Sequence, residues 1–265
     1  MITIFEYFGY DIPINERYRL IKQAGFNGVL AWWSDEFGDI NFRSNPEIAR
    51  KQGLFIENIH TTEYVNDLWF DNLKGQQIIN NLLRYIEDCA IYEISTMVVH
   101  LTEGNKPPAL NDIGLNRIKI IAEKAEHEGI NIALENLRHN IPHLQYILSN
   151  VQSKRIGFCY DSRYDSNNQN LPIPNVDLLS KYRNRLMALH LHDNNGSTIP
   201  YLTHLLPFDG TINWFNTMKK ISELHYHGAT ALEVMNYGYE HLSAEEFLSK
   251  AYQVAIKLEE LRNVE

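Results

Sequence analysis

Short runs of β-forming residues alternate with amphipathic helical segments along the whole 265-residue chain. The apolar runs are rich in Ile, Val, Leu and aromatic residues, which is typical of strands buried on both faces of a parallel sheet. Eight such strands are predicted at residues 2–7, 28–33, 54–60, 96–101, 131–136, 156–161, 186–193 and 228–235. Eight helices are predicted to follow them, at residues 15–24, 45–52, 74–93, 109–128, 141–150, 175–183, 212–224 and 243–262.

This alternation favours a parallel α/β fold in which right-handed crossovers join neighbouring strands. About 250 residues is the usual size of a (β/α)8 barrel. The alternative is a doubly wound open sheet, but the segment GVLAWWSDEFG after the second strand lacks a glycine-rich phosphate fingerprint. No linker rich in Pro, Gly or Ser divides the chain. We therefore expect residues 1–265 to form a single α/β domain, a (β/α)8 TIM barrel.

The net charge, the cysteine content and the N-terminal sequence indicate which partners and which cellular compartment to expect. The formal net charge of −9 disfavours binding to a nucleic-acid backbone. Cys89 and Cys159 are the only cysteines, too few for a disulfide framework. The first residues lack the basic head and continuous apolar run of a signal peptide, and the apolar runs are too short to cross a bilayer. We expect a cytoplasmic protein with reduced thiols.

Most of the predicted strands end in a side chain that can bind a metal or move a proton. In a (β/α)8 barrel the carboxyl ends of all strands meet at one rim, where the active sites of this fold lie. Six consecutive strands, the third to the eighth, each end in His, Asp or Glu, a pattern that is hard to ascribe to chance. These residues are His60, His100, Glu135, Asp161, His190 with His192, and Glu233.

The alternation of residue size predicts the direction of these side chains. Residues two apart share one face of a strand, and the residues two positions before the polar ones are mostly small, as a crowded barrel interior requires. Their outward neighbours are large and suited to packing against helices. The polar side chains are therefore expected to face inward at the rim. The inward set is Asn58, Val98, Ala133, Cys159, Ala188 and Ala231, and the outward set is Leu134, Tyr160, Leu189 and Leu232.

Each strand-end residue taken alone also has an ordinary structural interpretation. A single inward His is more often a core residue than a ligand, and an Asp after a strand more often caps a helix or forms a turn. An inward carboxylate, however, must be paired or metal-bound to offset its lost hydration. Three carboxylates and one imidazole suit one divalent ion, which would be Mn²⁺, Mg²⁺, Co²⁺ or Fe²⁺, with Zn²⁺ as a further option. The predicted metal ligands are Glu135, Asp161, His190 and Glu233.

Seven motifs, in their order and spacing, resemble one family along essentially the whole chain. This family is the xylose isomerase-like (β/α)8 barrels, which include sugar and sugar-phosphate isomerases and epimerases, inosose dehydratases and the endonuclease IV type of AP endonuclease family 2. The motifs are specific to the superfamily and not to one reaction. They are ENIHT (57–61), VVHLTEG (98–104), IALENL (132–137), IGFCYDS (156–162), ALHLHDN (188–194), HLLPFDGTINW (204–214) and ALEVM (231–235).

The resemblance implies roles for the residues at the rim. The metal ligands of the epimerases match the four residues predicted above. His190 is preferred over His192 because Asp193 completes the family pattern His-x-x-acid from His190. Glu135 and Glu233 resemble the acid/base pair that acts on opposite faces of the sugar. The resemblance thus makes these two glutamates the catalytic residues.

The chain also departs from the endonuclease pattern. His60 and His100 match histidines that hold an additional metal in the endonucleases, and without that metal they are expected to contact substrate. Relatives often carry His where this chain has Tyr164, and the endonucleases carry Asp at the position of Leu202, two residues before His204. Both missing groups bind metal in the DNA-cleaving site. Their loss argues against phosphodiester cleavage.

The expected reaction is metal-assisted proton transfer next to a sugar carbonyl, through a cis-enediolate. Return of the proton to the same carbon is epimerisation and return to the neighbouring carbon is aldose–ketose isomerisation, and the sequence leaves both open. Arg163 suits a substrate phosphate or carboxylate, and an aromatic ring at the second strand end suits a sugar face. The expected substrate contacts are Trp32, His60, His100, Arg163, Tyr164, His192 and His204.

Three alternatives remain at this point: an inosose-type dehydratase, an endonuclease IV-like metal-dependent hydrolase, and a non-catalytic sugar-binding protein on the same barrel. The expected partner is a small-molecule sugar or sugar phosphate, with no nucleic acid and no membrane, and homo-oligomerisation stays open. Five further histidines are expected to be ordinary surface residues. They are His139, His143, His225, His227 and His241.

Overall fold

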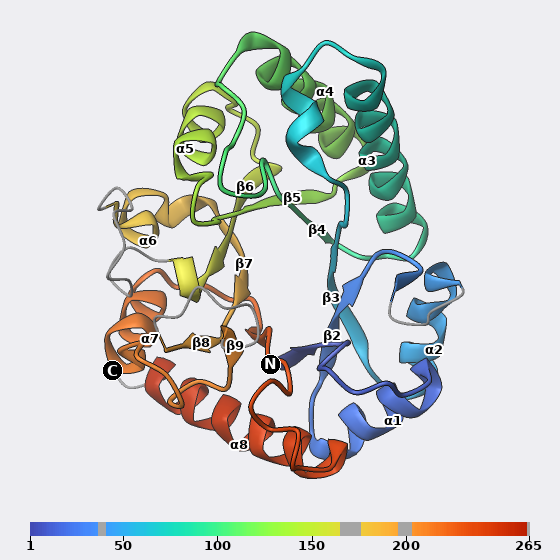
Figure 1. The fold of residues 1–265 in the computed structure, drawn as a ribbon, viewed down its shortest axis with the longest axis vertical. Helices are drawn as coiled ribbons and strands as arrows, with labels where there is room; N and C mark the ends of the chain where they lie inside the picture. Colours follow the sequence, from blue (N-terminus) through green and yellow to red (C-terminus); the bar gives the residue numbers. More distant parts are fainter. Residues whose placement is uncertain (37–40, 165–175, 196–202, 264–265) are drawn as a thin grey trace.

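The computed structural model describes residues 1–36, 41–164, 176–195 and 203–263. Within them, eight parallel strands form one sheet in the order β10-β1-β2-β3-β4-β5-β6-β7. The strands surround a central axis and the helices lie outside them (Figure 1). A parallel bridge between Leu191 and Leu232 joins the two edges of the sheet. The (β/α)8 barrel predicted from the sequence is confirmed.

The strands and helices follow the predicted order closely. The barrel strands are β1 (Ile2–Phe5), β2 (Gly28–Trp32), β3 (Phe55–His60), β4 (Thr96–Val99), β5 (Asn131–Glu135), β6 (Ile156–Asp161), β7 (Leu186–His190) and β10 (Thr230–Leu232). The helices are α1 (Ile14–Ala24), α2 (Asn45–Lys51), α3 (Leu73–Ile91), α4 (Asp112–Glu128), α5 (Ile141–Asn150), α6 (Leu178–Lys181), α7 (Trp214–Glu223) and α8 (Ala244–Arg262).

The predicted seventh strand, 186–193, is divided in the structure. Strand β7 ends at His190, and Asp193 begins the short strand β8 (Asp193–Asn194), which pairs antiparallel with β9 (Thr203–Leu205). The cause is the buried carboxylate of Asp193. It accepts hydrogen bonds from the backbone N–H of Ile212, at 3.1 Å, and from the indole Nε1 of Trp214, at 2.7 Å. Asp193 therefore ties the segment that follows β7 to the start of α7.

The predicted inward and outward sets separate in the structure except at Ala231, which was expected inward and belongs to the main hydrophobic core. The small inward residues Val98, Ala133, Cys159 and Ala188 form a buried cluster of their own. The large outward residues Leu134, Tyr160, Leu189 and Leu232 belong to the main hydrophobic core, which also contains the apolar faces of the helices. The strand-end residues, two positions further along the inward face, therefore lie above a layer of small side chains.

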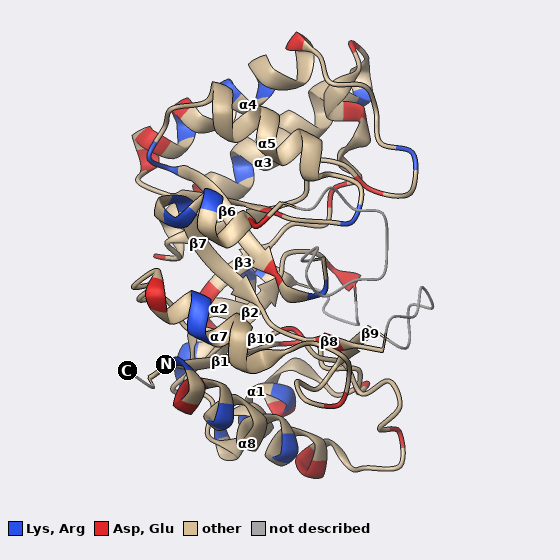
Figure 2. Ribbon diagram, turned by 90° about the vertical axis from the view of Figure 1, so that its left-hand side faces the viewer, with Lys and Arg blue, Asp and Glu red and all other residues tan. Residues whose placement is uncertain are grey.

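Charged side chains lie on the outer surface of the molecule. Lys, Arg, Asp and Glu lie along the outer helices, and α8 carries both signs (Figure 2). Helix α8 begins with a capping box, in which the Ser243 hydroxyl accepts from the Glu246 N–H and the Glu246 carboxylate accepts from the Ser243 N–H. The described helices include none that is long and apolar enough to cross a membrane.

Candidate metal centre

A cavity of about 490 Å³ lies at the carboxyl ends of the strands. This volume is in the usual range for small-molecule sites, and the location is where the active sites of this fold lie. Polar groups at its base are surrounded by aromatic and apolar walls. The lining residues are Phe5, Trp32, His60, His100, Glu135, Leu137, Asp161, Arg163, Tyr164, Thr203, His204, Glu233, Met235 and Tyr237.

Glu135, at the end of β5, is surrounded by imidazole rings. Its Oε2 lies 3.0 Å from His60 Nε2 and 3.0 Å from His100 Nε2. Its Oε1 lies 3.2 Å from His190 Nδ1. Burial alone would raise the pKa of Glu135, but His190 and His100 hold the pKa well below its usual range. The structure therefore keeps this buried carboxylate ionised.

Glu233 follows β10 and approaches the same histidine from another strand. Its Oε2 lies 3.3 Å from His190 Nδ1, so His190 stands between the two glutamates. Burial opposes ionisation of Glu233, but His190 outweighs it and lowers the pKa to about 2. Both predicted catalytic glutamates are thus ionised and face one shared volume.

Asp161, at the end of β6, lies beside a second pair of histidines. Its Oδ1 is 3.1 Å from His192 Nε2, and it also accepts a hydrogen bond from the Arg163 N–H at 2.7 Å. The rings of His192 and His204 stack with centroids 4.3 Å apart and planes at 15°. Burial and the neighbouring His192 lower the pKa of His204 to about 3, which keeps its ring neutral.

The structure groups the candidate ligands differently from the prediction. One ligand atom each from His60, Glu135, His190 and Glu233 lie within 4.8 Å of one another. His60, expected to contact substrate, thus lies among three of the predicted metal ligands. Asp161, the fourth, lines the same cavity on the side of His192.

These residues fit a divalent cation. Three buried carboxylates line the cavity, and each lies within 4 Å of an imidazole nitrogen. Arg163 lines the same cavity. Mixed carboxylate and imidazole donors suit Mn²⁺, Fe²⁺, Co²⁺ and Zn²⁺. A bound dication would displace the protons that the positively charged imidazoles carry in the metal-free site. The pKa of His100, raised to about 10 by Glu135 and Glu103 against the effect of burial, shows how strongly the site attracts positive charge.

The remaining predicted substrate contacts lie around this centre. The Trp32 ring stacks on His60, with centroids 5.1 Å apart, and lines the cavity. Its neighbour Trp33 is fully buried and donates from Nε1 to Asp88. Arg163 lies over the Tyr164 ring at 4.8 Å. Burial, with Asp161 nearby, raises the pKa of Tyr164 to about 12, so its hydroxyl stays protonated at neutral pH.

Two side chains that tie the strand ends together were missed at the sequence level. Asn136 donates from Nδ2 to the Asp161 carbonyl at 2.9 Å and accepts from the Asp161 N–H at 2.8 Å. The Ser162 hydroxyl donates to the His192 carbonyl at 2.7 Å and accepts from the His192 N–H at 3.0 Å. Each directly follows a candidate ligand in the sequence, and that position is the signal that could have found them.

The buried glutamate at the first strand end was also missed. Glu6 follows β1 and is fully buried. Its Oε1 accepts a hydrogen bond from the Trp32 N–H at 2.7 Å, and its Oε2 accepts one from the Tyr18 hydroxyl. The rule applied to the other strand ends would have selected Glu6, but its contacts hold α1 and β2 together outside the cavity.

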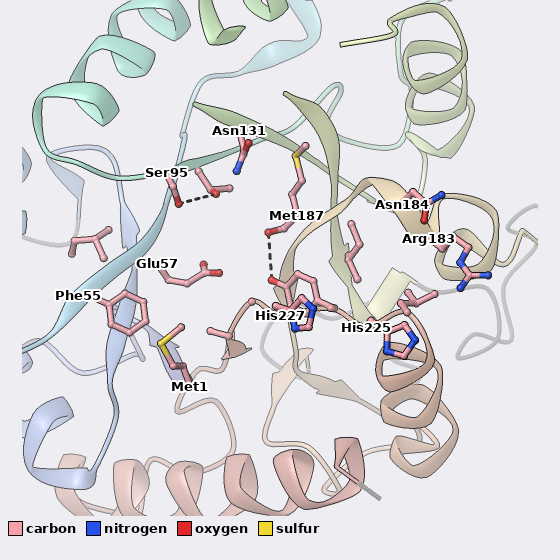
Figure 3. A pocket seen from close by; sticks show the side chains of 17 residues that line it. Met1, Phe55, Glu57, Ser95, Asn131, Arg183, Asn184, Met187, His225 and His227 are labelled. Atoms are coloured by element: carbon pink, nitrogen blue, oxygen red, sulfur yellow. Dashed lines mark hydrogen bonds between the residues drawn. The ribbon is translucent and has the colours of Figure 1, made fainter. Parts of the chain in front are cut away.

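The opposite end of the barrel holds a second cavity, of about 540 Å³. Figure 3 shows Glu57 directed into it, with Phe55 and Met1 on one side and His227 and His225 on the other. Burial raises the pKa of Glu57 to about 7. Among the described residues, Glu57 is the only carboxylate that lines this cavity, and no metal-ligand cluster lies there. The paired carboxylates and metal ligands found at the carboxyl ends of the strands are therefore absent from the described lining of this cavity.

One of the histidines expected at the surface is buried. His143 is 3% exposed, and its Nε2 lies 2.9 Å from the Pro108 carbonyl. Its ring packs edge-on against Trp69. The prediction was wrong because α5 turns this side chain toward the core. Leu202, whose departure from the endonuclease pattern the sequence indicates, lies outside the described residues.

The comparisons with known proteins agree with this architecture. The sequence profile of the xylose isomerase-like TIM barrel family matches residues 18–256. The chain belongs to this family. Protein y4fM of Sinorhizobium fredii, described as uncharacterized, is 31% identical to it over an alignment that covers 95% of this chain and 90% of that protein.

Solved structures with the same fold superpose on nearly the whole chain. A D-psicose 3-epimerase from Clostridium cellulolyticum H10, solved with D-tagatose, has a TM-score of 0.79 at 10% identity. The alignment covers 100% of this chain and 100% of that chain. The IOLI protein, solved with a zinc atom, has a TM-score of 0.74 at 16% identity, with 99% of this chain and 98% of that chain covered. This chain spans 43% of a longer fusion with a 4-hydroxyphenylpyruvate dioxygenase, at a TM-score of 0.79, 14% identity and 99% coverage of this chain. At these identities the likeness concerns the fold.

Proposed function

We propose that this protein is a divalent-metal-dependent isomerase or epimerase of a sugar or sugar phosphate. The observation that carries the proposal is the pair Glu135 and Glu233. Both are buried, both are held ionised, and they lie 3.2 and 3.3 Å from the same His190 nitrogen. Two such carboxylates facing one cavity suit the removal and return of a proton on a bound substrate. The sugar epimerases among the structures of the same fold support this choice.

We assign the metal to Glu135, Asp161, His190 and Glu233. His60 is within reach of the same volume and is a further donor. A cation held there supplies Lewis-acid polarisation of a sugar carbonyl and of the neighbouring hydroxyl. The metal ion is one of Mn²⁺, Mg²⁺, Co²⁺, Fe²⁺ or Zn²⁺.

The two glutamates carry the proton transfer. One takes the proton from the carbon beside the carbonyl, and the cis-enediolate of the substrate forms between them. The other glutamate then delivers a proton, either to the same carbon, as an epimerase does, or to the neighbouring carbon, as an isomerase does. His100 lies beside Glu135, its pKa is raised to about 10, and it can supply the proton that Glu135 delivers.

The walls of the cavity suit a polyol. Trp32, Tyr164 and Tyr237 offer flat faces for the C–H surface of a sugar, and the polar rim groups can bind its hydroxyls. Arg163, over the Tyr164 ring, is placed to bind a phosphate or carboxylate of the substrate. The thiols of Cys89 and Cys159 are free and buried, and we place the enzyme in the reducing cytoplasm.

Deuterium exchange tests this proposal. The metal-loaded protein is incubated in D₂O with a panel of ketoses and ketose phosphates, and deuterium at carbon is followed by NMR. We expect metal-dependent incorporation into at least one substrate, and a loss of about 10²–10⁴-fold in Glu135→Gln and in Glu233→Gln. Glu57→Gln is the matched control, because it makes the same change in a glutamate at the opposite end of the barrel, and it should retain exchange.

Two results would contradict the mechanism. One is the absence of exchange with every substrate in protein whose bound metal has been verified. The other is exchange that persists in both rim variants. Loss of water from a polyol ketone without return of product would indicate a dehydratase on the same scaffold.

A further inference from the structure

His192 is buried in a way that the metal site described above does not explain. Its side chain is 0% exposed, and neither ring nitrogen has a hydrogen-bond partner within the described part of the chain. Its Nε2 lies 3.1 Å from Asp161 Oδ1 and 3.8 Å from Glu233 Oε2. A polar group left in this state costs about 1–3 kcal/mol. The Nε2 of this ring therefore faces two carboxylates of the rim, those of Asp161 and Glu233.

His204 reaches the same point from the β8–β9 hairpin. Its Nδ1 lies 3.0 Å from the Thr203 hydroxyl, which leaves Nε2 to face the cavity, 3.9 Å from Glu233 Oε2. Its backbone has a φ of 59°, a left-handed conformation that non-glycine residues rarely adopt. The Met235 N–H donates to the His204 carbonyl at 2.9 Å and holds the residue there. The fold thus keeps a strained residue in place to present this ring.

Two imidazoles and one carboxylate converge here. One ligand atom each from His192, His204 and Glu233 lie within 4.8 Å of one another. Two histidines and a carboxylate form a donor set suited to Fe²⁺, Co²⁺, Mn²⁺ or Zn²⁺. Asp161 borders both this set and the first site, and Glu233 belongs to both.

We propose that the chain binds a second divalent cation beside the first, held by His192, His204 and Glu233, with Glu233 shared between the two. The second site rests on the proposed function, because it shares that glutamate with the first metal. Two dications exceed the charge of the three carboxylates by one, which suits a substrate with an anionic group. In this arrangement His192 and His204 act on the substrate through the second cation and not by direct contact.

Metal stoichiometry tests the second site without any assay of turnover. Chelator-treated protein is titrated with Co²⁺ or Mn²⁺, bound metal is counted by equilibrium dialysis and elemental analysis, and Mn²⁺ is examined by electron paramagnetic resonance. We expect two equivalents and a spin-coupled signal in the wild type. His204→Asn should bind one equivalent with an uncoupled signal, since Asn tolerates the left-handed backbone of this position. His241→Asn, at an exposed histidine, should still bind two.

The outcomes separate the two proposals. One equivalent in the wild type overturns the second site and leaves the first. No bound metal in the wild type overturns both. Two coupled equivalents in folded His204→Asn, with folding checked by thermal unfolding, also overturn the second site as assigned. His192→Asn gives an independent variant, for which we expect the same reduction from two equivalents to one.

Discussion

Glu233 shows how individual residues at the rim depend on one another. Its carboxylate is buried, which opposes ionisation, yet His190 at 3.3 Å lowers its pKa from 4.5 to about 2. Glu135 is held in the same state by the same ring and by His100. In the metal-free chain the imidazoles therefore stabilise the ionised form of the carboxylates. The ionised form is the one that binds a dication.

This interaction predicts a specific dependence of stability on pH. Because the pKa of Glu233 is lower in the folded state, its contribution to stability is present above pH 4.5 and is lost as the pH falls toward 2. That contribution is on the order of 3 kcal/mol. In the presence of chelator, the free energy of unfolding, measured with denaturant between pH 6 and 3, should fall less steeply in Glu233→Gln than in the wild type. Glu245→Gln, at an exposed residue of α8, should follow the wild type, and equal slopes in all three proteins would contradict this assignment.

The ends of neighbouring strands are joined by side chains as well as by the sheet. Asn136 makes two hydrogen bonds with the backbone of Asp161, and Ser162 makes two with the backbone of His192. These bonds link β5 to β6 and β6 to the segment that follows β7. They fix the relative positions of Glu135, Asp161 and His192, and thus the spacing of the ligands.

Removing one of these links should weaken both folding and metal binding. Asn136→Ala leaves the buried N–H and carbonyl of Asp161 without partners, so we expect a loss of about 1–3 kcal/mol in unfolding free energy. Metal affinity, measured by titration, should fall about 10–100-fold, as it does when groups that orient ligands are removed. Asn80→Ala, at an exposed position of α3, should change neither quantity appreciably. Unchanged metal affinity in Asn136→Ala would show that the link does not position the ligands.

The elements were predictable from the sequence because each strand and helix has its own local pattern. All eight barrel strands and all eight helices lie where periodicity placed them, with ends that differ by a few residues. The division at Asp193 was not predictable, since its carboxylate is held by Ile212 and Trp214, about twenty residues away. In the same way, the position of Asp161 beside His192 depends on how β6 and β7 are packed, which no local pattern contains.

At the scale of the whole molecule, barrel closure brings together side chains from distant parts of the chain. Strand β10 pairs with β1 and reaches β7 through the Leu191–Leu232 bridge, which carries Glu233 to the rim already formed by Glu135 and His190. The small inward residues below leave space for a cavity of about 490 Å³. The size of this cavity and the net charge of −9 both favour a small molecule as the substrate.

The central claim is that this rim holds a divalent cation between the two glutamates. Anomalous diffraction from crystals of the full chain grown with Mn²⁺ or Co²⁺ tests it most directly, because it locates the metal without reference to a substrate. We predict an anomalous peak at coordination distance, about 2.0–2.3 Å, from Glu135, Asp161, His190 and Glu233. The absence of a peak at the rim at saturating metal, or a peak only elsewhere, such as beside Glu57, would contradict the account.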